Sequence, residues 1–383
     1  MQIETAVETP APVTARIPWE VACLMAAATS MVLGLYWDLA WHRSIGRDSF
    51  WTPAHVAIYL GGIMGGIAAA GSILPATFGR SARALSLRTV SARVWGFRGP
   101  LGAFVSAWGG IAMLTSAPFD NWWHNAYGLD VKVVSPPHIL LLLGIVAVEL
   151  GGLLLVQQLR ANAPQSRGAR LEWLMFYVGG MILSTIMITL EEFANRFTLH
   201  SALAYAVLST GVPLIVLTIG GASGHRWGCT AVAGVYMLAR LLQLWIFPLF
   251  PAEPKLGPVF IHVTHFIPTG FPILLMAPAA ALDLLRARRS AALAGTAFLA
   301  ALLAIEWPFA GFLMLPAARN WFFGMHYIPY QVNLPDPQWP YRFQPQESSL
   351  AQFCFVLAVG LGLAILSTRA GMALSARLAR LRR

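Results

Sequence analysis

Residues 53–77 read PAHVAIYLGGIMGGIAAAGSILPAT and contain no Asp, Glu, Lys or Arg. A helix that crosses the hydrocarbon core of a bilayer needs about 20 mostly apolar residues, so this stretch predicts a transmembrane helix. Similar apolar runs recur along the chain, and together they predict about ten transmembrane helices. The expected helices cover residues 19–37, 53–77, 100–117, 137–158, 171–190, 201–220, 228–249, 259–281, 291–314 and 349–368.

The composition places the whole chain among integral membrane proteins. Of its 383 residues, 57% are hydrophobic and 11% are charged, whereas an ordinary soluble domain carries about 25% charged residues. The net charge of +10 does not indicate a nucleic-acid partner, because the basic residues are scattered between apolar runs. We therefore expect an all-α membrane protein whose first partner is the lipid bilayer.

The basic residues also predict the orientation in the membrane. With the N-terminus inside, 18 of the 26 Lys and Arg residues fall in inner segments and seven in outer segments. The positive-inside rule therefore favours cytoplasmic N- and C-termini. In this topology eight of the nine histidines lie on the outer side. The expected location is the inner (cytoplasmic) membrane, with a face rich in metal-type ligands outside the cytoplasm.

Four regions follow from this topology. A cytoplasmic tail is expected over residues 1–18 and a basic cytoplasmic tail over 369–383. Between them, 19–158 is expected to be a duplicated helical-hairpin region with metal sites, and 159–368 a six-helix membrane region. The second of these contains an outer loop rich in aromatic residues and proline, 315–348, which we interpret either as a lid over the metal face or as an interfacial plug.

Two outer hairpins carry the same pattern of Asp, Trp and His. The pattern D-x-x-W-H-x3-G-x-D begins at Asp38 and again at Asp120. Each copy is followed by P-x-H, which ends at His55 or His138. The correspondence predicts an internal repeat that relates helices 1 and 2 to helices 3 and 4.

Each copy of the pattern offers one carboxylate and two imidazoles to a metal ion. The Asp and the first His are spaced i, i+4, which places them on one helix face with Cβ atoms about 5–6 Å apart. The second His follows a proline at the start of the next helix, and a short loop folds it back toward the other two. Such a set suits copper, zinc or iron(II) and leaves coordination positions open. The predicted ligand sets are Asp38, His42 and His55, and Asp120, His124 and His138.

A hydrogen-bonded belt at the membrane interface is the alternative to metal binding. Tryptophan anchors at headgroup depth, and a duplicated hairpin can keep its residues for packing alone, so the pattern leaves both interpretations open. Asp48 and Asp130 close the two copies. We interpret them either as acceptors for imidazole N–H groups or as N-caps of a short loop helix.

The second half of the chain supplies further candidate ligands or relay groups. They are Glu191, Glu192, His200, His262, His265 and Glu306. Solvated loop charge is the alternative for the first three. Ionisable residues at membrane depth are costly and tend to face a cavity or a partner. His262 and His265 are expected on one helix face, and Arg240 is expected either in a functional relay or in a structural pair with Glu306 or another acid.

The spacing of Asp38, His42 and His55, D-x3-H-x12-H, resembles the ligand set in the C subunit of the copper membrane monooxygenases, the particulate methane and ammonia monooxygenase family. The resemblance implies that these three residues bind copper within the membrane region. Through the repeat it extends to the Asp120 copy, where the last gap is 13 residues. It covers about 20 residues per copy, and the doubled pattern and the number of spans depart from that family.

The resemblance implies a copper-dependent membrane oxidoreductase that uses O2 to oxidise a small apolar substrate. Zinc and iron are the alternative metals. Electrons would come from a quinol or a partner protein, and other membrane subunits or a second copy of the chain are expected partners. A membrane protein that binds or transports copper or zinc is the alternative function, and a structural subunit whose Asp/His pairs merely share hydrogen bonds is the third.

Overall fold

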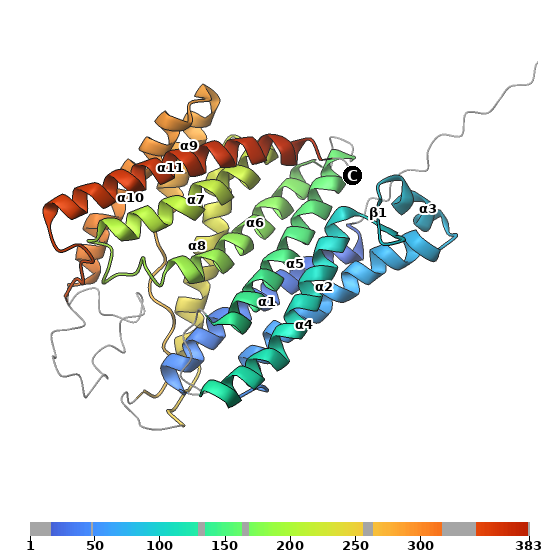
Figure 1. The fold of residues 1–383 in the computed structure, drawn as a ribbon, viewed down its shortest axis with the longest axis horizontal. Coiled ribbons are helices and arrows are strands. Elements are labelled where there is room, and N and C mark those ends of the chain that lie inside the picture. The colour runs from blue at the N-terminus through green and yellow to red at the C-terminus, as the bar shows by residue number, and fades with distance from the viewer. Residues whose placement is uncertain are drawn as a thin grey trace, which may run out of the picture.

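The computed structural model describes most of the chain as a bundle of long helices (Figure 1). The described residues are 17–46, 49–128, 135–162, 168–255, 263–315 and 342–381. Within these ranges, nine helices are long and apolar enough to cross a membrane. The chain is therefore a multi-pass α-helical membrane protein, as the composition predicts.

The predicted repeat region folds as two helical hairpins. They consist of α1 (Trp19–Ser44) with α2 (Pro53–Phe78), and α4 (Leu101–Tyr127) with α5 (Pro136–Ala161). Both α2 and α5 begin with proline. Proline is favoured there because the N–H group of the first helical residue has no acceptor within the helix. Small residues bring α4 and α5 close together, because a Cβ atom at Gly109 would lie 2.6 Å from the carbonyl oxygen of Gly144.

The second half of the described chain contains five of the long helices. They are α6 (Gly168–Leu190), α7 (Ala202–Ser223), α8 (Gly228–Ile246), α10 (Ala291–Leu313) and α11 (Leu350–Ala379). The last helix continues beyond residue 368, so the expected tail over 369–383 is helical up to Ala379. Most of the expected aromatic loop, 316–341, lies outside the described residues.

The segment between α2 and α4 has structure that the all-α prediction omits. It contains a short helix, α3 (Ala82–Thr89), and an antiparallel hairpin of β1 (Ala92–Val94) and β2 (Phe97–Gly99). Both elements lie at the end of α2 and α4 opposite the predicted metal ligands (Figure 1).

The predicted helix over 259–281 is wrong in the part that the structure describes. Residues 263–275 are not helical, and α9 covers only Met276–Leu285. Pro268, Gly270 and Pro272 explain the difference, because proline removes a helical hydrogen bond and glycine lowers helix propensity. The apolar content of the segment is high enough for a span, but its backbone cannot stay helical.

Side chains from α1 form hydrogen bonds with the backbone of the non-helical segment 263–275. The Ser44 hydroxyl accepts a hydrogen bond from the Ile267 amide at 2.7 Å, and the Arg43 guanidinium donates to the Pro268 carbonyl at 3.1 Å. Irregular backbone at membrane depth is tolerated only where protein satisfies its polar groups. The C-terminal end of α1 provides these partners.

Arg240 on α8 links the same segment to the end of α6. Its side chain is 2% exposed and lies 2.6 Å from a carboxylate oxygen of Glu191. It also donates to the hydroxyl of Thr269 at 2.6 Å and to the carbonyl of Gly270 at 3.2 Å. One guanidinium therefore ties together three parts of the chain that are far apart in sequence.

We expect Arg240→Met to destabilise the protein by about 3–5 kcal/mol, because it leaves the Glu191 carboxylate without its charged partner. SDS-induced unfolding in mixed micelles, followed by circular dichroism, measures the change. Arg369→Met on the exposed face of α11 is the matched control and should change stability by less than about 0.5 kcal/mol. Equal unfolding curves for Arg240→Met and wild type would contradict this account of the broken segment.

Candidate metal centre

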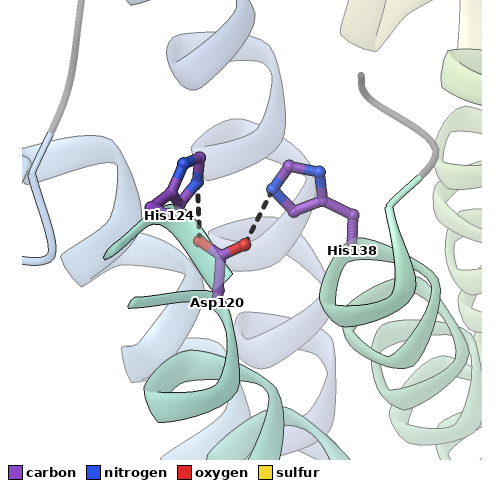
Figure 2. Close-up of side chains that lie close together, drawn as sticks. All are labelled: Asp120, His124 and His138. Carbon is purple, nitrogen blue, oxygen red and sulfur yellow. Dashed lines mark ion pairs between the residues drawn. The ribbon is translucent and has the colours of Figure 1, made fainter. Parts of the chain in front are cut away.

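The three predicted ligands of the second hairpin lie together (Figure 2). One oxygen of Asp120 is 3.2 Å from Nε2 of His138, and the other is 3.4 Å from Nε2 of His124. One ligand atom from each residue can be chosen so that all three lie within 4.8 Å of one another. The carboxylate therefore lies between two imidazoles, in an arrangement that can hold a metal ion.

Local structure explains how the three side chains meet. Asp120 and His124 stand one turn apart in the last part of α4, so both point from the same helix face. His138 lies in the first turn of α5, where the hydroxyl of Ser135 caps the helix by accepting from the His138 amide. The tight packing of α4 against α5 brings the end of one helix to the start of the other.

The hydrogen bond at Nδ1 of His124 indicates what lies between Nε2 and the carboxylate. Nδ1 is 3.3 Å from the carbonyl oxygen of Gly128, and a carbonyl only accepts, so Nδ1 carries the proton. In the neutral ring Nε2 then has a lone pair, which faces an oxygen of Asp120. Two lone pairs repel, so the geometry calls for a metal ion or an additional proton between them.

The distances at Asp120 suit a metal ion. With ligand bonds of about 2.1 Å, separations of 3.2 and 3.4 Å between ligand atoms correspond to angles of about 100–110° at the metal. In addition, the Oδ1 atom of Asp120 is buried, and its 3.2 Å contact with Nε2 of His138 is not a well-formed hydrogen bond. A buried carboxylate oxygen without a donor is expected to contact a cation or an ordered water.

The Asp38 trio has the same plan with a wider opening. Asp38 Oδ1 lies 3.2 Å from Nε2 of His55, and Oδ2 lies 3.8 Å from Nε2 of His42. Nδ1 of His55 is 3.0 Å from the carbonyl oxygen of Ser49, so its Nε2 lone pair also faces the carboxylate. The side chain of His42 is 49% exposed, and it would have to move slightly to close the site around an ion.

The two trios have different surroundings. Next to the first, Arg43 and Ser44 bind the broken segment, and the Trp41 ring lies 6.2 Å from the Phe266 ring. At the equivalent places of the second copy the chain has Asn125 and Ala126. Trp122 and Tyr127 beside the second trio are 55% and 66% exposed. The first trio therefore adjoins the second half of the bundle, and the second lies beside exposed aromatic side chains.

Three of the other predicted residues, Asp48, Asp130 and His262, lie outside the described residues. The other acids and histidines of the second half that the structure describes do not join either trio. Glu191 binds Arg240 and accepts from the hydroxyl of Tyr236 at 3.0 Å, which is a structural role, and Glu192 is exposed. The ring of His200 stacks against aromatic neighbours, and its Nε2 is 2.8 Å from the carbonyl oxygen of Trp307.

His265 and Glu306 differ from their predicted surroundings. His265 lies in extended backbone that pairs with Pro251. The prediction that His265 lies on a helix face is therefore wrong. Glu306 is 1% exposed and accepts a hydrogen bond from the Leu274 amide. The acid that pairs with Arg240 is Glu191. Glu306 instead satisfies the backbone of the broken segment.

Glu149 is a buried acid that the candidate sets above omit. It lies in the middle of α5, is 1% exposed, and accepts a hydrogen bond from the Thr185 hydroxyl at 3.0 Å. Its second oxygen has no hydrogen-bond partner among the described residues. As the only charged residue in the apolar run 139–158, it could have been identified from the sequence alone.

The comparisons with known proteins give no relative. No family model matches the chain, no curated protein matches it, and no solved structure matches it. The function is therefore inferred from the residues themselves and from the spacing that resembles the copper membrane monooxygenases.

We expect the wild-type protein to retain two metal ions per chain after loading with Cu(II) and desalting. His124→Ala and His42→Ala should each lose about one ion, because each removes one of only three protein ligands. Mass spectrometry of the metal content gives the stoichiometry. His225→Gln, on the loop between α7 and α8 at the far end of the bundle, is the control and should bind as wild type. Unchanged stoichiometry in both test variants would refute metal binding by the trios.

Proposed function

We propose that this protein is a metal-dependent, and specifically copper-dependent, membrane oxidoreductase that oxidises a small apolar substrate at the extracytoplasmic face. One observation carries the proposal. A carboxylate lies between two imidazoles at the ends of apolar helices, and in each hairpin at least one imidazole engages Nδ1 with a backbone carbonyl and directs Nε2 at that carboxylate. A set of three protein ligands leaves coordination positions open for small molecules.

The choice of copper has two supports. Two imidazoles and one carboxylate suit copper, zinc and iron(II), and the spacing of the first trio resembles the copper ligand set described above. A bound copper ion would supply one-electron redox chemistry. The chain itself holds the ion, fixes the imidazole tautomer through Gly128 and Ser49, and orients the rings.

An apolar substrate fits the position of the second trio. Trp122 and Tyr127 next to it are exposed aromatic side chains, which in a bilayer favour the interface between lipid and water. A substrate dissolved in the bilayer would reach the site without crossing an aqueous layer. In a monooxygenation, one oxygen atom of O2 enters the substrate and the other leaves as water, with two electrons and two protons from a quinol or a partner protein.

A transport function is the second candidate, and Glu149 is the observation that favours it. A transporter needs polar groups along a path through the membrane. Glu149 in the middle of α5 and Thr185 in the C-terminal part of α6 provide such groups. In this alternative the trios would collect copper or zinc from outside the cytoplasm, and the buried acid would serve the passage of the ion.

Oxygen consumption in proteoliposomes tests the proposed reaction. With copper, a soluble quinol and a small alkene, the wild-type protein should consume O2 and form the oxidised alkene. Asp120→Ala and Asp38→Ala should each be tested, and at least one should lower the rate by 100-fold or more, because the carboxylate contacts both imidazoles of its trio.

The same vesicles separate the two functions. Oxidised product without accumulation of metal inside the vesicles supports the oxidoreductase. Copper accumulation inside the vesicles that is lost in Glu149→Gln, together with no oxidation of the alkene, supports the transporter and contradicts the oxidoreductase. Glu172→Gln, near the N-terminal end of α6, is the matched control for the loss of one acid and should leave both measurements unchanged.

A further inference from the structure

An apolar groove of about 340 Å³ lies between α2, α4 and the β1–β2 hairpin, and none of its lining residues belongs to either trio. Its floor includes small residues, Gly66 and Ala70 on α2 and Ala107 on α4. A Cβ atom built on Gly66 would meet no atom within 4 Å, so the groove is open at that point. Its lining is almost entirely apolar, which suits a hydrocarbon chain.

The hairpin forms one wall of the groove and has a fixed shape. Its turn residues Trp95 and Gly96 have φ angles of 48° and 86°, as a two-residue turn with two positive φ angles requires. A bulky residue such as tryptophan seldom adopts this conformation. The Trp95 side chain is 80% exposed and its ring lies 5.3 Å from that of Trp108.

The hydrogen bonds of the hairpin fix it to the helices. The Thr77 hydroxyl accepts from the amide of Arg98 at 2.8 Å and donates to the carbonyl of the same residue at 3.0 Å. Just before the hairpin, the side-chain amide of Gln158 on α5 donates to the carbonyl of Val90, the residue that follows α3, at 2.8 Å. The groove is therefore a built feature of the fold with walls from three elements.

The two faces of the hairpin have opposite character. Val94 and Phe97 form one cross-strand pair and line the groove. Arg93 and Arg98 form the adjacent pair, and successive pairs point to opposite faces. Both arginines are exposed, and no carboxylate pairs with either of them in the described part of the chain. Like charges directly opposite each other destabilise a hairpin, so a bound anion between the two guanidinium groups would stabilise this one.

We propose that the groove and the arginine pair together bind one anionic phospholipid. One acyl chain occupies the groove along α2 and α4. The long side chains of Arg93 and Arg98 start from the opposite face of the hairpin and extend around its edge to the headgroup phosphate at the mouth of the groove. The exposed Trp95 at the tip lies at headgroup depth, where tryptophan is favoured. The occupant is a lipid and not a soluble anion, because the apolar lining and the charge pair adjoin each other on one hairpin. This inference is independent of the metal sites.

Native mass spectrometry of the delipidated protein tests the proposal with two lipids of equal chain length, phosphatidylglycerol and phosphatidylcholine. Wild type should bind the anionic lipid more tightly. The double variant Arg93→Gln/Arg98→Gln should weaken phosphatidylglycerol binding by about 30-fold, from about 1 kcal/mol for each arginine near an anionic headgroup. Arg377→Gln/Arg380→Gln at the exposed end of α11 is the matched control and should bind as wild type.

Filling the groove tests the acyl-chain half of the proposal. Gly66→Leu places a side chain in the open space and improves helix propensity, so it should fold as wild type and lose tight binding of both lipids. Thermal unfolding in detergent confirms the fold. Unchanged phosphatidylglycerol binding in Gly66→Leu, or equal loss in the arginine variant and its α11 control, would overturn the proposal. Inorganic phosphate that competes with phosphatidylglycerol at micromolar concentration would also overturn it, because a soluble anion would then be the ligand.

Discussion

The contact between an imidazole lone pair and a carboxylate oxygen is the interaction on which the candidate site depends. His55 and His124 each engage Nδ1 with a backbone carbonyl, so in the neutral ring the other nitrogen faces an Asp oxygen without a proton of its own. A cation between the two atoms converts this repulsion into two ligand bonds. Gly128, whose φ of 96° turns the chain, presents the carbonyl that orients His124. Backbone carbonyls, as well as side chains, therefore orient the imidazole rings of the site.

A second constraint shapes the rest of the bundle. Inside a membrane every backbone N–H and C=O needs a partner from the protein. Helices provide their own partners, and the broken segment before α9 takes its partners from side chains of α1, α8 and α10. Two of these side chains, Arg43 and Ser44, directly follow His42 of the first trio. The first trio is therefore joined to the second half of the bundle, whereas the second trio lies apart from it.

Features that depend on the spacing of residues within one helix or one helix start could be predicted from the sequence. The i, i+4 spacing of Asp120 and His124 and the proline before His138 were enough to bring the three ligands together, because a helix face and a helix start are local features. Nine of the ten expected spans also appear as long helices in the described part of the chain. Their apolar runs alone identify them.

Contacts between distant segments could not be predicted in this way. The run over 259–281 has the apolar content of a span, but Pro268, Gly270 and Pro272 prevent a continuous helix. The partner of Arg240 was left open between acids, since the sequence does not show that the end of α6 meets the middle of α8. The hairpin at Trp95 was missed because a tryptophan in a positive-φ turn is not a usual turn signal.

X-ray absorption at the copper edge of the loaded protein tests the central claim most directly. The account predicts about two imidazole nitrogens and one oxygen from the protein at about 2.0–2.2 Å from each ion, with the imidazole scattering reduced in a variant that lacks His124. A spectrum with no imidazole scattering, or with sulfur as the main ligand, would contradict it.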